Sequence, residues 1–118
     1  EVEKHRSVED QHYRIASKFR DWGIPTAECI NEIRQGLSKV PLIASGGLRG
    51  GLDLAKAIAL GANIGGIAGP FLSAANRSVE SVLTLIQEIE LELRITMFAA
   101  GVVDIQSLAN TPLVRKSK

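Results

Sequence analysis

Two adjacent glycines followed by an arginine are the residues of this chain whose types and spacing could do chemistry. They stand in residues 45–50, Ser-Gly-Gly-Leu-Arg-Gly, between an apolar run and a stretch with helical spacing. A helix start presents unpaired backbone N–H groups and a partial positive charge, so it favours an anion. Glycine lets the backbone approach a phosphate without a Cβ in the way, and Arg49 adds a planar, permanently charged donor.

A second junction of the same kind follows about twenty residues later. Residues 62–70 are a short apolar segment that ends in Ala68, Gly69 and Pro70. In (β/α)8 barrels, phosphate groups are often held by the loops after the last two strands and by a nearby helix N-terminus. The two junctions together therefore predict one phosphate site.

The elements that must position these junctions alternate in type. Residues 40–44 predict a strand buried on both faces, residues 52–60 a helix that Gly61 ends, and residues 62–68 a second strand. This order predicts an α/β fold with parallel strands and helices packed outside them.

Further helices are expected on both sides of this unit. Four residues are expected to cap helix N-termini: Ser7, Thr26, Ser78 and Asp104. The helix after Ser7 should run to about Phe19, and the helix after Thr26 to residues 36–38. A long amphipathic helix should follow Ser78 and end at Gly101, and a short one should span Ile105 to Ala109.

Composition limits the functions that this chain could have. Its 118 residues are under half of a typical barrel, so we expect a single partial domain over residues 1–118. A net charge of +1 and 4% aromatic residues give no reason to expect nucleic acid as a partner. The single Cys29 allows neither an internal disulfide nor a cysteine cluster for zinc.

No apolar run is long enough to span a membrane and no signal-peptide pattern opens the chain, so we expect a soluble protein of a reducing compartment. The sequence begins at Glu1 rather than methionine, which leads us to expect part of a longer protein.

Five segments resemble the C-terminal half of type 2 isopentenyl-diphosphate isomerase. They are residues 21–26 (Asp-Trp-Gly-Ile-Pro-Thr), 42–49, 52–62, 68–72 and 92–98, the last followed by Gly101. The resemblance runs from Trp22 to Val114. A Gly-Gly-x-Arg junction also occurs in other FMN-dependent barrels, but the combination with the other segments is specific. Gly65 and Gly66 depart from the pattern, because bulkier residues are expected there.

The resemblance implies the C-terminal half of a TIM (β/α)8 barrel in a cytoplasmic homo-oligomer, a tetramer or octamer. The family interconverts isopentenyl diphosphate and dimethylallyl diphosphate with reduced FMN as the acid–base group, NADPH as reductant and Mg²⁺ on the substrate. Six residues would contact FMN: Gly46, Gly47, Leu48, Arg49, Ala68 and Gly69. The catalytic and metal-binding residues of the family lie in its N-terminal half, so no residue here inherits those roles, and the chain by itself should be inactive.

Two alternatives remain open. An FMN-dependent 2-hydroxy-acid oxidase shares the phosphate junction, but residues 8–40 contain His12 without the histidine and arginine motif that those enzymes carry there. The other alternative is a non-catalytic half-barrel that self-associates. Its open strand edges and apolar interior would be exposed to water in a monomer, and association would bury them.

Overall fold

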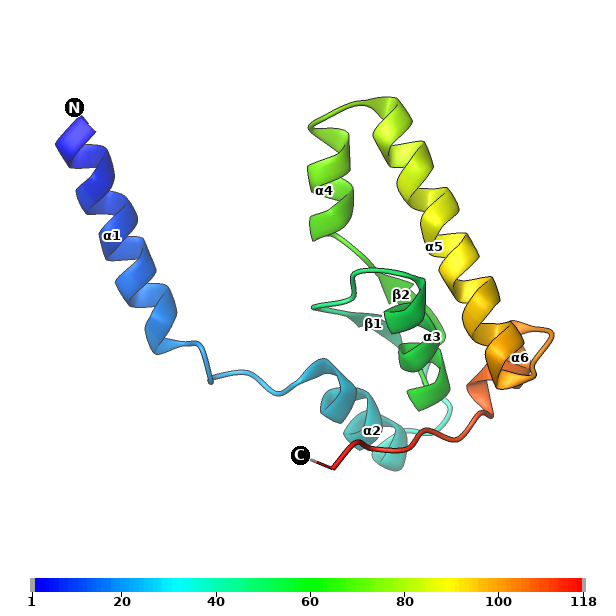
Figure 1. Cartoon of the computed structure of the whole chain (residues 1–118). Coiled ribbons are helices and arrows are strands. Elements are labelled where there is room, and N and C mark those ends of the chain that lie inside the picture. Colours follow the sequence, from blue (N-terminus) through cyan, green and yellow to red (C-terminus); the bar gives the residue numbers. More distant parts are fainter. Residues whose placement is uncertain (1, 118) are drawn as a thin grey trace.

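The structure, a computed structural model, describes residues 2–117, and describes side chains for residues 8–117. Over this range the chain forms six helices and two short strands (Figure 1). In chain order they are α1 (Val2–Lys18), α2 (Thr26–Gly36), β1 (Ile43–Ser45), α3 (Gly51–Leu60), β2 (Ile64–Gly66), α4 (Gly69–Ala75), α5 (Val79–Ala100) and α6 (Ile105–Ala109). The α/β fold class is confirmed.

Strands β1 and β2 are parallel neighbours, as the strand–helix–strand order predicted. Ile43 pairs with Ile64, Ala44 with Gly65, and Ser45 with Gly66. Helix α3 makes the crossover between the two strands and lies between the sheet and α5 (Figure 1). Both strands are shorter than the apolar runs that predicted them.

The core gathers on both sides of α3. Toward the sheet and α2, the buried cluster is Ile30, Ala44, Leu48, Ala57 and Ala62. Toward α5 and α6, Ala55 and Ile58 meet Leu108, with Leu93 and Met97 packed against them. Alanine makes up much of this core. Its small side chain allows the backbones of the helix and the sheet to approach each other closely.

The expectation that β1 is buried on both faces is wrong. Ala44 is buried, but Ile43 is 66% exposed and its partner Ile64 is 57% exposed. Side chains alternate along a strand, so Ile43 and Ile64 lie on one face and Ala44 on the other. Parallel sheets are usually covered on both faces, and this one is covered on a single face within residues 8–117.

Packing explains why Gly65 stands where we expected a bulkier residue. A Cβ at this position would collide with the Cδ1 atom of Leu54 and come within 3.2 Å of Leu48. The glycine therefore allows α3 to lie directly against β2.

Several helix ends follow local sequence signals. Ser78 accepts the Ser81 N–H at 3.0 Å at the start of α5, and Gly101 ends that helix with a φ of 72°. Asp104 caps α6 by accepting the Ser107 N–H at 2.7 Å. These three predictions are confirmed.

Two predictions about the other helices are wrong, and one helix was not predicted. Helix α1 begins at Val2, upstream of Ser7, because the residues before Ser7 include no glycine or proline to stop it. Pro25, not Thr26, is the N-cap of α2, and no side chain caps that helix. Helix α4 was not predicted, although Pro70 in its first turn is a typical start signal.

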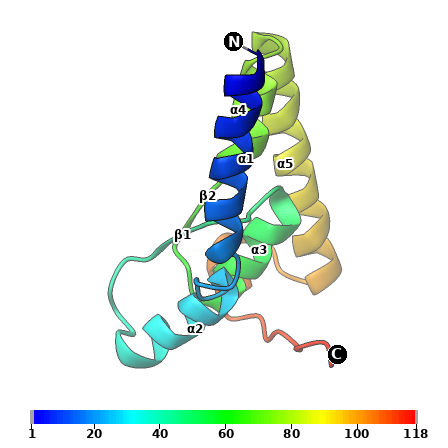
Figure 2. The same ribbon diagram turned by 90° about the vertical axis from the view of Figure 1, so that its left-hand side faces the viewer.

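The molecule is open rather than compact. Helix α1 stands apart from the other elements in Figure 1, and in Figure 2, which is viewed from its side, it lies in front of them. The radius of gyration is 17.9 Å, whereas a compact chain of this length would have about 13 to 14 Å.

Candidate phosphate-binding site

The six residues expected to contact FMN line one pocket. Its lining consists of residues 45–49 and 66–70, and its volume is about 450 Å³. All six expected residues lie in these two segments: Gly46, Gly47, Leu48, Arg49, Ala68 and Gly69. The structure therefore brings the two junctions together, as the sequence predicted.

The sheet explains why these distant segments meet. Because β1 and β2 are parallel and paired in register, their C-terminal ends, Ser45 and Gly66, lie side by side. The loop to α3 and the loop to α4 leave the sheet at this edge (Figure 1). Ligands of parallel α/β sheets bind at this edge in general.

The Gly-Gly turn has a backbone that other residues rarely adopt. Gly46 has a φ of 98° and Gly47 a φ of 77°, in the left-handed region that favours glycine. A Cβ at Gly47 would meet no atom within 4 Å, so the space beside this residue is open. The N–H groups of Gly47 and Leu48 donate to no acceptor in the part of the chain that the structure describes.

Gly69 supplies the facing side of the pocket in the same way. A Cβ there would also meet nothing within 4 Å. Its N–H donates to no acceptor within the described residues, while the next residue, Pro70, has no N–H at all. Unpaired N–H groups thus come from both loops, and open glycine positions allow an anion to approach them.

The first turn of α3 differs from the sequence-based expectation. The carboxylate of Asp53 accepts the Arg49 N–H at 3.0 Å, and that of Glu92 accepts the Leu52 N–H at 3.3 Å. Two donors at this helix start are therefore already paired with the chain's own carboxylates. The N–H groups of Gly47 and Leu48, just before this helix start, have no such partner among the described residues.

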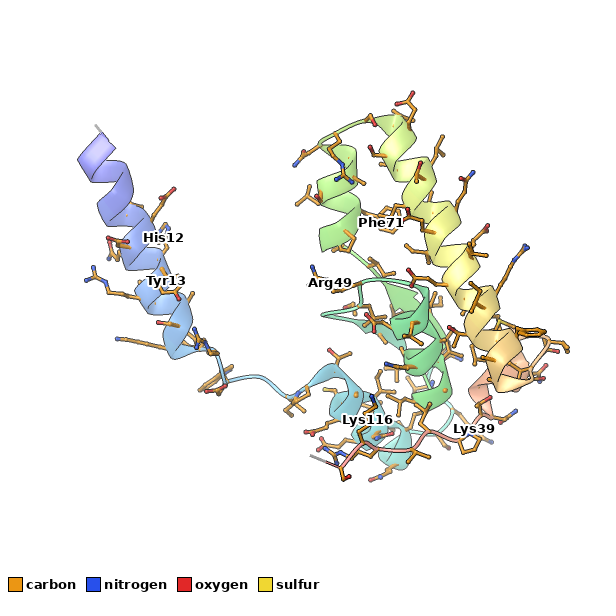
Figure 3. All side chains as sticks on the ribbon, in the orientation of Figure 1. His12, Tyr13, Lys39, Arg49, Phe71 and Lys116 are labelled. Carbon is orange, nitrogen blue, oxygen red and sulfur yellow. The ribbon has the colours of Figure 1, made fainter. Side chains whose placement is uncertain are left out.

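Arg49 carries the positive charge of the pocket. Its side chain is exposed, and Figure 3 shows it at the end of the sheet nearest α4. Within residues 8–117 its guanidinium group pairs with no carboxylate. Arg49 also lines a neighbouring pocket of about 500 Å³ with Arg77, Glu80 and Glu88. The carboxylates make that second pocket less suited to an anion than the glycine-lined one.

Two residues make long-range contacts that the sequence did not predict, Thr26 at the glycine turn and Arg34 at the opposite end of the strands. Thr26 donates its hydroxyl proton to the Gly46 carbonyl oxygen at 2.8 Å. Arg34 donates from Nε to the Gly61 carbonyl oxygen at 2.6 Å and from Nη2 to Asn63 Oδ1 at 2.7 Å. Thr26 belongs to the Trp-Gly-Ile-Pro-Thr segment, and the family resemblance of that segment could have drawn attention to it. No sequence pattern drew attention to Arg34.

The remaining chemically active side chains lie elsewhere. His12 is on α1, away from the pocket (Figure 3), and Cys29 is a half-buried free thiol on α2. Among the described residues, no group of three or more His, Cys, Asp or Glu side chains could hold a metal ion. In the same part of the chain, no helix has the length and apolar character needed to cross a membrane.

Comparison with known proteins places the chain in the class of FMN-dependent proteins with a TIM-barrel-type fold. A mandelate oxidase variant, crystallised with 4-Br-2-hydroxy-methylphenylacetate, superposes with a TM-score of 0.71 at 29% identity. The match covers 76% of this chain and 28% of that one. This likeness implies a fold of the TIM-barrel type.

The sequence pattern of the FMN-dependent dehydrogenase family matches residues 18–115. The chain belongs to this family. The matched range includes both loops of the candidate pocket and α2, so the site lies wholly within the family's region.

Individual relatives confirm the resemblance to isopentenyl-diphosphate isomerase. The chain is 42% identical over 114 residues to the isopentenyl-diphosphate delta-isomerase of Oceanobacillus iheyensis and 48% identical over 114 residues to that of Synechococcus sp.. It is 50% identical over 95 residues to that of Vibrio parahaemolyticus. The first two matches cover 97% of this chain and 33% of the relative. The chain thus spans about a third of the length of these relatives.

Proposed function

We propose that the full-length protein containing this chain is an FMN-dependent isopentenyl-diphosphate delta-isomerase, and that this chain is the C-terminal part of its barrel. In this proposal the chain holds the 5′-phosphate of FMN. The observation that carries the proposal is the pocket in which both glycine-bearing loops present N–H groups that have no acceptor among the described residues. The similarity to isomerases, at 42 to 50% identity, supports the choice of reaction.

The residues present fit a phosphate dianion. Gly47 and Gly69 leave open space where a side chain would block the approach, and their N–H groups can donate to phosphate oxygens. Arg49 can neutralise part of the charge, since its guanidinium group is exposed and pairs with no carboxylate within residues 8–117. Hydrogen bonds to a charged acceptor are stronger than those between neutral groups.

The bound cofactor would supply the acid–base group that moves a proton across the allylic double bond. This chain would hold the cofactor by its phosphate and so orient it toward the rest of the barrel. The apolar face of the sheet, with Ile43 and Ile64, would pack against the strands of the N-terminal part. That part would bind the diphosphate substrate, its Mg²⁺ ion and the reductant NADPH.

The exposed face of the sheet and the open shape support the proposal that the first partner of this chain is the N-terminal part of the same barrel. A homo-oligomer in the cytoplasm, a tetramer or octamer, remains part of the proposal through the family resemblance. Exposed apolar side chains on the outer helix α5, such as Leu91, Ile95 and Phe98, are available for contacts between subunits.

A 2-hydroxy-acid oxidase is the second candidate, favoured by the superposition on mandelate oxidase. Its identity of 29% is lower than the 42 to 50% shared with the isomerases. The phosphate pocket would serve either reaction, because it contacts only the part of the cofactor remote from the chemistry.

Activity of the full-length protein separates the two candidates. We expect conversion of isopentenyl diphosphate to dimethylallyl diphosphate when FMN is reduced, and none when it is oxidised. Hydrogen peroxide release with mandelate, lactate or glycolate, without isomerisation, would support the oxidase and contradict the proposal.

A further inference from the structure

Thr26 holds the Gly46–Gly47 turn from outside the pocket. Its hydroxyl donates to the Gly46 carbonyl oxygen at 2.8 Å and lies 3.4 Å from the Ser45 carbonyl oxygen. Thr26 is the first residue of α2, and it does not line the pocket of the six candidate residues. The contact joins two elements that are about twenty residues apart in sequence.

The geometry of the peptide bond connects this contact to the pocket. In a planar trans peptide, the carbonyl of one residue and the N–H of the next point in opposite directions. The Gly46 carbonyl points at Thr26, so the Gly47 N–H points away from Thr26. That N–H has no acceptor in the part of the chain that the structure describes. One hydrogen bond thus fixes the direction of a donor in the proposed phosphate site.

The turn needs such a restraint. Gly46 and Gly47 both have positive φ, and glycine has the widest choice of backbone conformations. A peptide plane between two glycines can rotate at little steric cost, which would turn a carbonyl oxygen toward an anion. The packing is close: a Cβ at Gly46 would come within 3.1 Å of Thr26 Oγ1.

We infer that Thr26 is a positioning residue for cofactor binding, which aims the Gly47 N–H at the phosphate. This inference rests on the proposed function, because it assumes that the phosphate of FMN occupies the pocket. It assigns Thr26 no contact with the cofactor. The role belongs to the hydroxyl, since the Pro25 N-cap leaves Thr26 no part in capping its own helix.

The test measures the affinity of the full-length apoprotein for FMN and for riboflavin, which lacks the phosphate. Thr26→Val removes the hydroxyl and keeps the shape of the side chain. We expect this variant to bind FMN about 5- to 10-fold more weakly, the effect of one hydrogen bond, while riboflavin affinity changes less than about 2-fold. Thr26→Ser keeps a hydroxyl and should restore the preference for FMN.

Thr111→Val is the matched control. Thr111 also donates its hydroxyl to a backbone carbonyl oxygen, that of Ser107 at 3.2 Å, but it lies after α6 and does not line the pocket. This variant should keep the wild-type preference for FMN over riboflavin. Equal losses for both flavins in Thr26→Val would show a general structural role and overturn the inference.

The remaining outcomes distinguish a failure of the Thr26 inference from a failure of the proposed function. If wild-type protein prefers FMN and Thr26→Val keeps that preference, Thr26 does not position the turn, although the pocket stands. If wild-type protein binds riboflavin as tightly as FMN, the phosphate site fails and the role of Thr26 fails with it. Should Thr26→Val not fold, loss of the preference in Thr26→Ser would overturn the role of the hydroxyl.

Discussion

Gly47 is the residue at which a side chain would act most directly on the pocket. We expect Gly47→Val in the full-length protein to weaken FMN binding at least about tenfold, since Val at a φ of 77° is strained and enters the open space. Flavin fluorescence titration of the apoprotein would measure this. Gly36→Val is the control, because Gly36 ends α2, has open space around it and is not at a positive φ. Unchanged FMN affinity in Gly47→Val would remove the turn from the site.

At the residue scale, the ionisation of Asp104 makes the stability of the fold depend on pH. The hydroxyl of Ser107, and then its backbone N–H, hydrogen-bond the carboxylate and lower the pKa of Asp104 below its usual value of 3.8. A lowered folded-state pKa means that the ionised carboxylate stabilises the fold above about pH 4. This stability is lost as the pH falls through the folded-state value.

Asp104→Asn should therefore remove a small part of the acid sensitivity of the full-length protein. Urea midpoints between pH 2 and pH 6 would measure it, with the variant approaching the wild type at the acid end. The effect should be small because the carboxylate is exposed. A variant whose midpoint falls with acid as steeply as that of the wild type would contradict this role for Asp104.

At the scale of elements, Arg34 ties α2 to the sheet and to the end of α3. Its guanidinium group donates to the carbonyl oxygens of Gly61 and Val40, each at 2.6 Å, and to Asn63 Oδ1 at 2.7 Å. Asn63 Oδ1 also accepts the Leu42 N–H at 2.8 Å, so the network reaches the start of β1. A planar fork of donors suits these separate acceptors, and lysine cannot reproduce it.

Arg34→Lys should destabilise the full-length protein by about 2 to 4 kcal/mol, the loss of two or more charged hydrogen bonds. Urea unfolding would measure the change. Arg94→Lys, on the exposed surface of α5, should change stability by less than about 0.5 kcal/mol. Equal stability of the two variants would show that the Arg34 network contributes nothing.

The elements also show how far sequence alone could predict the structure. Ser78, Gly101 and Asp104 act on their own helices, so local patterns sufficed to place the ends of α5 and α6. The Gly-Gly turn and the order of strands were predictable for the same reason.

Contacts between distant residues were not predictable in this way. Thr26 holds a carbonyl twenty positions away, and Glu92 caps α3 from forty positions away on α5. The residues show no local pattern that would reveal such partners. The burial of β1 was overestimated because an apolar run does not reveal whether a second layer is present in the same chain.

At the scale of the whole molecule, the exposed apolar face governs the behaviour of the isolated chain. A peptide of residues 1–118 should self-associate or precipitate, because Ile43, Ile64 and the strand edges are uncovered. It should show no isomerase turnover, since the proposed substrate and metal sites lie outside it. Light scattering after size exclusion and an isomerase assay would measure both. A monodisperse monomer, or detectable turnover, would contradict the half-barrel proposal.

The most direct measurement is a crystal structure of the full-length protein with FMN bound. We expect phosphate oxygens within about 3 Å of the backbone nitrogens of Gly47 and Gly69, and the Arg49 guanidinium group beside them. The flavin ring should extend from this pocket toward the face of the sheet that carries Ile43 and Ile64. A phosphate bound away from both glycine-bearing loops would contradict the assignment of this chain as the cofactor-phosphate part of the enzyme.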